Sequence, residues 1–175
     1  MARSIAKARS EGIDVRAICF INPGNPTGNC LSADNLAEII KICHQEKLVL
    51  LADEVYQTNV FMEGREFTSA KNVLLSLGPE YQDVPLFSFH SVSKGVLGEC
   101  GRRGGYVECT NVDEEVISEL YKLASISLCP NVSGQLMVHL MVDPPKESDP
   151  SYLKYQAEVS EIHGNICYSL TFSLI

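Results

Sequence analysis

The sequence predicts an α/β fold in which a mostly parallel β-sheet carries helices on both faces. Short apolar stretches typical of buried strands alternate with amphipathic helical segments, the pattern of a sheet built from strand–helix–strand units. The link between the third and fourth apolar stretches is too short to hold a crossover helix. That last pair of strands is therefore expected to run antiparallel.

The first elements are predicted from two apolar runs and one helical repeat. Residues 15–21, VRAICFI, are typical of a buried strand, and residues 48–52, LVLLA, of a second. Between them Ser32 is a suitable N-cap for a helix. Four apolar residues of that helix repeat at the spacing of a single face: Leu36, Ile39, Ile40 and Cys43.

The middle of the chain predicts two more strands. Residues 59–83 are polar and rich in turns, with a weak helical signal at 69–77. Residues 84–90, VPLFSFH, indicate the third strand, and residues 104–110, GGYVECT, a short fourth one.

The last third of the sequence predicts three helices. The first covers residues 113–127 and has acidic residues in its first turn. Its apolar residues are expected to face inward: Val116, Ile117, Leu120 and Leu123. The second helix, 134–142, is stopped by Asp143-Pro144-Pro145, and the third, 151–163, is expected to end at Gly164. The tail after Gly164 is β-like, with no partner sequence after it.

Composition excludes several classes of protein. The 175 residues, 45% of them hydrophobic, suffice for one domain or a large piece of one. The net charge of −8 argues against a general nucleic-acid binder, and the apolar runs are too short for a membrane span. An odd number of cysteines, seven, without a C-x-x-C pair fits neither a structural zinc site nor a disulfide framework, so no metal site is expected.

The N-terminal sequence bears on the compartment. MARSIAKARSEG lacks the apolar stretch of a secretory signal, and the cysteine usage favours a reducing compartment. A surface helix leading into the first strand is the preferred interpretation of this segment, and a mitochondrial targeting helix is the alternative. The expected location is the cytoplasm or the mitochondrial matrix, not the secretory route.

Polar side chains follow three of the predicted strands. The first strand is followed by NPGNPTG, the second by DEVY and the third by SVSKG. Each motif alone has a structural explanation: a turn-rich loop, a helix cap, a solvated lysine. Ligands of open parallel sheets bind beyond the carboxyl ends of the strands, where all three segments would meet. Together they therefore favour a functional site.

The chemistry of this set points to pyridoxal 5′-phosphate (PLP). A lysine amine forms a Schiff base with an aldehyde, and a buried carboxylate keeps a pyridine nitrogen protonated. Amide and phenol groups can hydrogen-bond a phenolic oxygen, while serine hydroxyls and an arginine suit a phosphate. PLP carries all of these groups. A nucleotide-binding Rossmann domain does not fit, because no G-x-G-x-x-G follows the first strand.

The same motifs resemble the fold-type I, class I and II aminotransferases. The longer strings CFINPGNPTG, LADEVYQ, SKGVLGECGRRGGY and LCPNVSGQ resemble the alanine aminotransferases within them, over about residues 16–158. The resemblance implies that residues 1–163 are the central part of an incomplete PLP-binding large domain. Residues 164–175 would be a divergent tail, and the N-terminal segment and small domain of the family would be absent.

The resemblance also assigns roles to individual residues. Lys94 would bind the cofactor as an aldimine and then move protons, and Asp53 would pair with the ring nitrogen. Asn25 and Tyr56 would hydrogen-bond the phenolic oxygen, and Tyr56 joins Lys94 and Asp53 in the catalytic set. The phosphate would be held by Ser91, Ser93 and Arg103.

One arginine of the pair is a departure from the family. The related string usually reads GECGYRGGY, so Arg103 stands at the family's arginine and Arg102 replaces a tyrosine. We therefore favour Arg103 as the phosphate ligand. The four histidines have no metal-binding spacing and are expected to be structural, and Cys100 is expected to pack near the cofactor loop.

The predicted function is transfer of the amino group of L-alanine to 2-oxoglutarate by a PLP-dependent enzyme that is a homodimer when full length. Its partners would be a small amino acid and a 2-oxo acid, with no nucleic acid and no membrane. Two alternatives stay open. The chain is an inactive truncated fragment that binds PLP weakly or pairs with a full-length subunit, or it is an aminotransferase of other amino-acid specificity.

Overall fold

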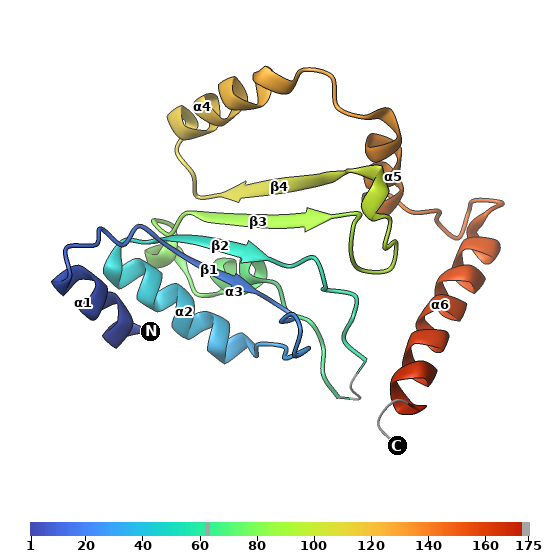
Figure 1. Ribbon diagram of the computed structural model, residues 1–175, viewed down its shortest axis with the longest axis horizontal. Coiled ribbons are helices and arrows are strands. Elements are labelled where there is room, and N and C mark those ends of the chain that lie inside the picture. The colour runs from blue at the N-terminus through green and yellow to red at the C-terminus, as the bar shows by residue number, and fades with distance from the viewer. Residues whose placement is uncertain (62–63, 173–175) are drawn as a thin grey trace.

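The protein is described by a computed structural model that covers residues 1–61 and 64–172, with the backbone alone for residues 163 and 165–172. Its centre is a four-stranded sheet of order β1-β2-β3-β4 (Figure 1). The strands are β1 (Ala17–Ile21), β2 (Val49–Asp53), β3 (Leu86–Ser91) and β4 (Gly105–Thr110). The first three are parallel, and β4 is antiparallel to β3. The predicted mostly parallel α/β sheet is confirmed.

Six α-helices accompany the sheet in the described residues (Figure 1). They are α1 (Ala2–Ser10), α2 (Ala33–Glu46), α3 (Ala70–Ser76), α4 (Glu114–Ala124), α5 (Val132–Val142) and α6 (Tyr152–Phe172). Three short 3-10 helices lie at Pro79–Tyr81, Cys100–Arg102 and Ser125–Ser127. The weak helical signal at 69–77 is confirmed as α3, which Ser69 caps through the Asn72 amide.

The core lies between the sheet and the helices α2 and α3. Ser32 caps α2 and closes a capping box with Asn35, so the predicted start of this helix is confirmed. The predicted apolar face of α2 is fully or almost fully buried, and α1 adds Ile5 to the same cluster. The other core residues, from the sheet, from α3 and from the residues just before β2 and β3, include Leu48, Leu50, Ala52, Val73, Leu74, Val84 and Leu86.

The opposite face of the sheet is more open. Side chains alternate along a strand, so the neighbours of the core residues point the other way. On that face Ile21 is 43% exposed, Phe89 38% and Val107 46%. Among the described residues, this face is therefore less covered than the face on which α2 and α3 pack. The apolar runs marked the strands correctly but did not show which element covers each face.

Helix α4 forms where the sequence predicts it, but its apolar face is not buried. Val116 is 44% exposed and Leu123 is 65% exposed. The expectation that these side chains point into a core is wrong in this chain. A helical repeat decides which side chains share a face, whereas burial requires a second element packed on that face.

The C-terminal tail also differs from its prediction. Helix α6 continues past Gly164 to Phe172 instead of giving way to a β-like tail, and residues 173–175 lie outside the described part. A lone strand would leave its backbone N–H and C=O groups unpaired, whereas a continued helix pairs them internally. One glycine inside a helix costs only about 1 kcal/mol relative to alanine, which is too little to stop it.

Leu50→Ala tests the core. Leu50 is 0% exposed in β2, so its truncation should lower the free energy of unfolding by roughly 2–5 kcal/mol. Urea unfolding followed by circular dichroism measures the change. Leu75→Ala is the control, since Leu75 is 59% exposed and should change stability by about 0.5 kcal/mol or less. Equal losses in the two variants would contradict this location of the core.

Candidate active site

The loop after β1 is tied to the end of β2. The buried Asn22 side chain accepts a hydrogen bond from the Leu31 amide at 2.8 Å, and the Asn22 backbone N–H donates to the Asp53 carbonyl at 2.9 Å. Asn22 Nδ2 is buried and has no hydrogen-bond partner among the described residues. The NPGNPTG segment therefore starts beside Asp53, as expected for loops at one edge of a parallel sheet.

Asn25 and Tyr56 meet in one cavity. The cavity has a volume of about 250 Å³ and is lined by the loop after β1, by Tyr56 and by Asn59. Lys94 reaches the same tyrosine from the loop after β3, because its Nζ lies 6.0 Å from the centroid of the Tyr56 ring. The structure thus brings together one predicted residue from each of the three strand ends.

Lys94 itself is exposed and stands at a second cavity of about 100 Å³. Met141 of α5 and Tyr155 of α6 line this cavity together with Thr58 and His90. Lys94 forms no ion pair with any described residue. An unpaired amine beside an aromatic ring is available for chemistry, since no carboxylate holds it.

Asp53 is half-buried at the end of β2. Its Oδ1 accepts a hydrogen bond from the Val55 amide at 3.3 Å, which closes the turn after the strand. No hydrogen bond or ion pair links Asp53 to Lys94 within residues 1–61 and 64–172. These two predicted catalytic side chains are therefore not in direct contact, and a group that touches both would have to lie between them.

Ser91, Ser93 and Arg103 form one hydrogen-bonded cluster. Ser91 Oγ accepts from the Ser93 amide at 3.0 Å and donates to the Gly104 carbonyl at 3.2 Å. Arg103 Nη1 donates to Ser93 Oγ at 3.5 Å and to the Cys100 carbonyl at 3.0 Å. All three predicted phosphate ligands are thus brought together, and the Cys100 thiol packs beside them on the Ser93 carbonyl at 3.0 Å.

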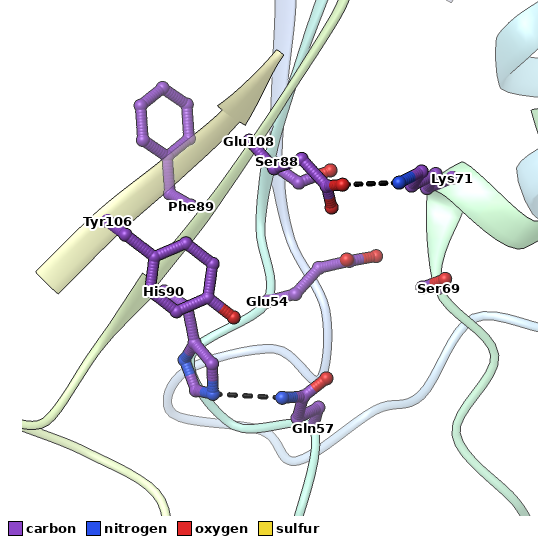
Figure 2. Close-up of a pocket in the computed structure, with 9 residues that line it drawn as sticks. All are labelled: Glu54, Gln57, Ser69, Lys71, Ser88, Phe89, His90, Tyr106 and Glu108. Atoms are coloured by element: carbon purple, nitrogen blue, oxygen red, sulfur yellow. Dashed lines mark hydrogen bonds and ion pairs between the residues drawn. The ribbon is translucent and has the colours of Figure 1, made fainter. Parts of the chain in front are cut away.

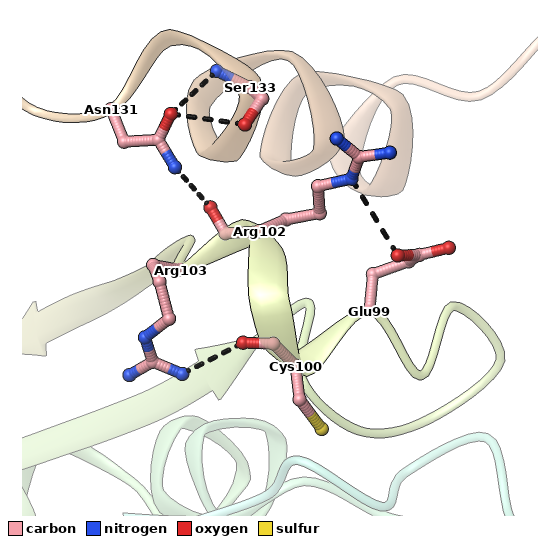
Figure 3. A network of polar contacts seen from close by, with 6 residues as sticks. All are labelled: Glu99, Cys100, Arg102, Arg103, Asn131 and Ser133. Atoms are coloured by element: carbon pink, nitrogen blue, oxygen red, sulfur yellow. Dashed lines mark hydrogen bonds and ion pairs between the residues drawn. The ribbon is translucent and has the colours of Figure 1, made fainter.

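The two neighbouring arginines have different surroundings (Figure 3). Arg102 Nε lies 3.7 Å from the Glu99 carboxylate, whereas the Arg103 guanidinium points away from it toward the Cys100 carbonyl. Arg103 pairs with no carboxylate in the described part of the chain. An anion would therefore find a free guanidinium at Arg103 and an already compensated one at Arg102.

The structure has a further polar cavity of about 160 Å³ that the sequence did not predict (Figure 2). Glu54 is buried there, 6% exposed, and its carboxylate accepts a hydrogen bond from the Ala70 amide at 2.7 Å. Burial raises the pKa of Glu54, and the bond from Ala70 opposes this shift. Glu54 therefore fixes the start of α3 against the end of β2.

His90 lies between this cavity and the cavity of Lys94, because it lines both. Its Nε2 is 2.8 Å from the Gln57 amide nitrogen, and its Nδ1 is buried without a described partner. Burial lowers the pKa of His90, while the negative charge of Asp53 opposes this change. The sequence feature that could have indicated this position is a histidine within an apolar strand, on the same face as Ser88. Among the described residues, no group of three or more His, Cys, Asp or Glu residues could hold a metal ion.

The site combines an open α/β sheet with a free amine, a free guanidinium and hydroxyl and amide groups at one strand edge. This is the donor set of a protein that binds a phosphorylated aldehyde cofactor through lysine. Known proteins of this class are similar to it in sequence. Residues 1–168 match the family model described as aminotransferase class I and II. The chain therefore belongs to this PLP-dependent family, which confirms the resemblance seen in the sequence.

Curated relatives agree with the family match. Glutamate–glyoxylate aminotransferase 1 from Arabidopsis thaliana is 56% identical over 159 residues, which cover 90% of this chain and 33% of that protein. Alanine aminotransferase 2 from Panicum miliaceum is 50% identical over 158 residues, again 90% of this chain and 33% of that protein. The chain spans about a third of the length of the curated relatives it matches.

Solved structures share the fold. Alanine aminotransferase from Pyrococcus furiosus superposes with a TM-score of 0.64 at 26% identity, covering 90% of this chain and 36% of that one. A PLP-bound putative aminotransferase from Clostridium difficile 630 gives a TM-score of 0.68 at 15% identity, over 97% of this chain and 39% of that one. At the lower identity the likeness concerns the fold alone.

Relatives differ in the compartment that their names give. A probable alanine aminotransferase from Dictyostelium discoideum, 51% identical over 167 residues (95% of this chain and 31% of that protein), is named as mitochondrial. Among the described helices of this chain, none combines the length and the apolar character that crossing a membrane requires.

Glu54→Gln tests the buried carboxylate. The pKa of Glu54 lies above its ordinary value of 4.5 in the folded chain, so folding favours the protonated form. The stability that Glu54 contributes is present below pH 4.5 and is lost as the pH rises through the folded pKa. Glutamine keeps an acceptor for Ala70 and carries no charge. The variant should therefore lose less stability than the wild type between about pH 4.5 and 7.

Urea unfolding at several pH values measures this difference. His90 acts in the opposite sense, because its lowered pKa costs stability as the pH falls below its ordinary value of 6.5, but it is present in both proteins. Glu80→Gln, at an exposed position, is the control and should follow the wild type. Identical pH profiles for Glu54→Gln and wild type would show that burial of Glu54 does not affect its titration.

Proposed function

We propose that this chain carries the central catalytic segment of an aminotransferase that moves an amino group between an amino acid and a 2-oxo acid. Residues 1–163 would be the central part of its PLP-binding large domain, followed by the divergent residues 164–175. The observation that supports this most directly is the free amine of Lys94 over the Tyr56 ring, next to the cavity of Asn25.

The residues present fit PLP group by group. Ser91, Ser93 and Arg103 form a hydrogen-bonded cluster, and the Arg103 guanidinium has no carboxylate partner among the described residues, which suits a phosphate. Asn25 and Tyr56 line a cavity that suits the phenolic oxygen, and Asp53 would hold the proton on the ring nitrogen. When bound, PLP supplies an aldehyde and a protonated ring that withdraws electrons from the substrate.

Each side chain then has a defined task. Lys94 Nζ would bind the aldehyde in the resting protein and, once displaced by the substrate amine, accept the proton of the substrate α-carbon. A positioned base of this kind contributes on the order of 10²–10⁴-fold in rate. The Tyr56 ring would restrict where the Lys94 amine can move. Asp53, at the end of β2, would be the carboxylate that pairs with the protonated ring nitrogen.

We propose L-alanine and 2-oxoglutarate as the substrate pair. The alanine aminotransferases among the relatives, at 50% identity over 158 residues, support this choice. Glyoxylate is a second candidate acceptor, because the relative with 56% identity over 159 residues is named a glutamate–glyoxylate aminotransferase. The full-length protein is proposed to be a homodimer of the cytoplasm or the mitochondrial matrix; the mitochondrial names of some relatives support the second location.

Covalent capture of PLP tests the role of Lys94. The chain is incubated with PLP and reduced with borohydride, and peptide mass spectrometry locates the pyridoxyl group. We expect the label on Lys94, and its loss together with transamination in Lys94→Ala, because the amine both binds the cofactor and moves the proton. Lys122→Ala is the control, since Lys122 is a solvent-exposed lysine of α4 paired with Glu119. A label on another lysine, or turnover by Lys94→Ala, would refute the assignment.

A substrate panel tests the reaction. Alanine with 2-oxoglutarate should give the highest kcat/KM, and glutamate with glyoxylate measures the second candidate. Labelling of Lys94 without turnover of any pair by the 175-residue chain would favour the alternative of an inactive PLP-binding fragment. In that case, activity that appears only after mixing with a full-length relative would indicate pairing with a complete subunit.

A further inference from the structure

We propose that the first turn of α5 positions the phosphate-binding arginine, through the close contact of Gly134 and Asn131 with the backbone of residues 102–104. Neither residue would touch the cofactor. Both would act through Arg103, so this inference rests on the proposed function of that side chain.

Asn131 fastens the start of α5 to the arginine loop (Figure 3). Its Oδ1 accepts from the Ser133 amide at 3.1 Å and caps the helix, while its Nδ2 donates to the Arg102 carbonyl at 2.7 Å. One side chain therefore joins the helix end to the residue directly before Arg103.

Gly134 brings the two backbones into contact. A Cβ atom at Gly134 would lie 2.7 Å from both the Arg102 and the Arg103 carbonyl oxygens. From the other side, a Cβ atom at Gly104 would lie 2.6 Å from the Gly134 carbonyl oxygen. These neighbours are backbone atoms, which cannot rotate away as a side chain can. Any larger residue at position 134 must push the loop and the helix apart.

Gly134 is also the buried residue of an otherwise half-buried or exposed helix. Glycine inside a helix is unfavourable by about 1 kcal/mol relative to alanine. The close approach to the loop explains why a glycine fits here, because only a residue without a side chain allows it. The contact of α5 with the rest of the chain is thus centred on the arginine loop.

The backbone at Arg103 requires support from a neighbouring element such as α5. Its φ is 54°, in the left-handed region that L-residues rarely adopt, and such a conformation persists only where the surroundings hold it. The Gly104 carbonyl in turn accepts hydrogen bonds from Ser91 Oγ at 3.2 Å and from the Val92 amide at 3.1 Å. A displacement of residues 102–104 would therefore move Arg103 and Ser91 together.

The experiment compares PLP with pyridoxal, which lacks the phosphate, by equilibrium dialysis against the wild type and Gly134→Ala. We expect the variant to lose about tenfold in affinity for PLP, the worth of one hydrogen bond to a charged group, and to keep its affinity for pyridoxal. Gly101→Ala is the matched control, because a Cβ at Gly101 meets no atom within 4 Å in the same loop. It should bind both compounds like the wild type.

Two further variants test the same contact between α5 and the arginine loop. Asn131→Asp retains the cap on Ser133 and removes the donor to Arg102, so it should lower the preference for PLP even if Gly134→Ala fails to fold. Arg103→Ala should by itself remove the preference for PLP over pyridoxal. Adding Gly134→Ala or Asn131→Asp to Arg103→Ala should therefore cause no further loss of this preference.

The outcomes are distinguishable. An equal loss for PLP and pyridoxal, or an unchanged preference in both α5 variants, would overturn the positioning role. A wild-type chain without any preference for PLP over pyridoxal would instead overturn the proposed function of Arg103 itself.

Discussion

The parallel alignment of β1, β2 and β3 is the constraint on which the site depends. Ile21 pairs with Asp53, and Asp53 pairs with Phe89, so the three strands end almost level. The register is fixed because Leu50 and Leu86, paired across β2 and β3, are both fully buried on the helix face. A slip by one residue would turn these side chains to the other face and would separate the three loops. Core packing thus determines where the polar residues meet.

The charges at this edge differ from those of the chain as a whole. The net charge is −8, yet Lys94 and Arg103 have no carboxylate partner in the described residues. Behind them, burial shifts Glu54 and His90 toward their neutral forms, since it raises the first pKa and lowers the second. Lys94 and Arg103 therefore offer two cations that no described carboxylate compensates, and such cations suit an anionic group.

Local patterns predicted most elements of the fold because the information for them lies within a few residues. The cap at Ser32, the apolar face of α2 and the apolar runs of β1 and β2 all hold in the structure. The same kind of pattern was insufficient for α4, whose apolar residues are exposed, and for the tail, where the helix continues through Gly164. Periodicity gives the shape of a segment; its burial depends on a partner elsewhere in the chain.

The sequence by itself determined the strands, the family and the residue types at each strand end, since the motifs NPGNPTG, DEVY and SVSKG are contiguous. Only the tertiary structure decided which arginine is free, because Glu99 compensates Arg102 and not Arg103. It also decided that His90 lies between two cavities and that Gly134 abuts residues 102–104. The Asn131–Arg102 and Gln57–His90 contacts join residues about thirty positions apart, and chain folding brings these together through packing that no local spacing encodes.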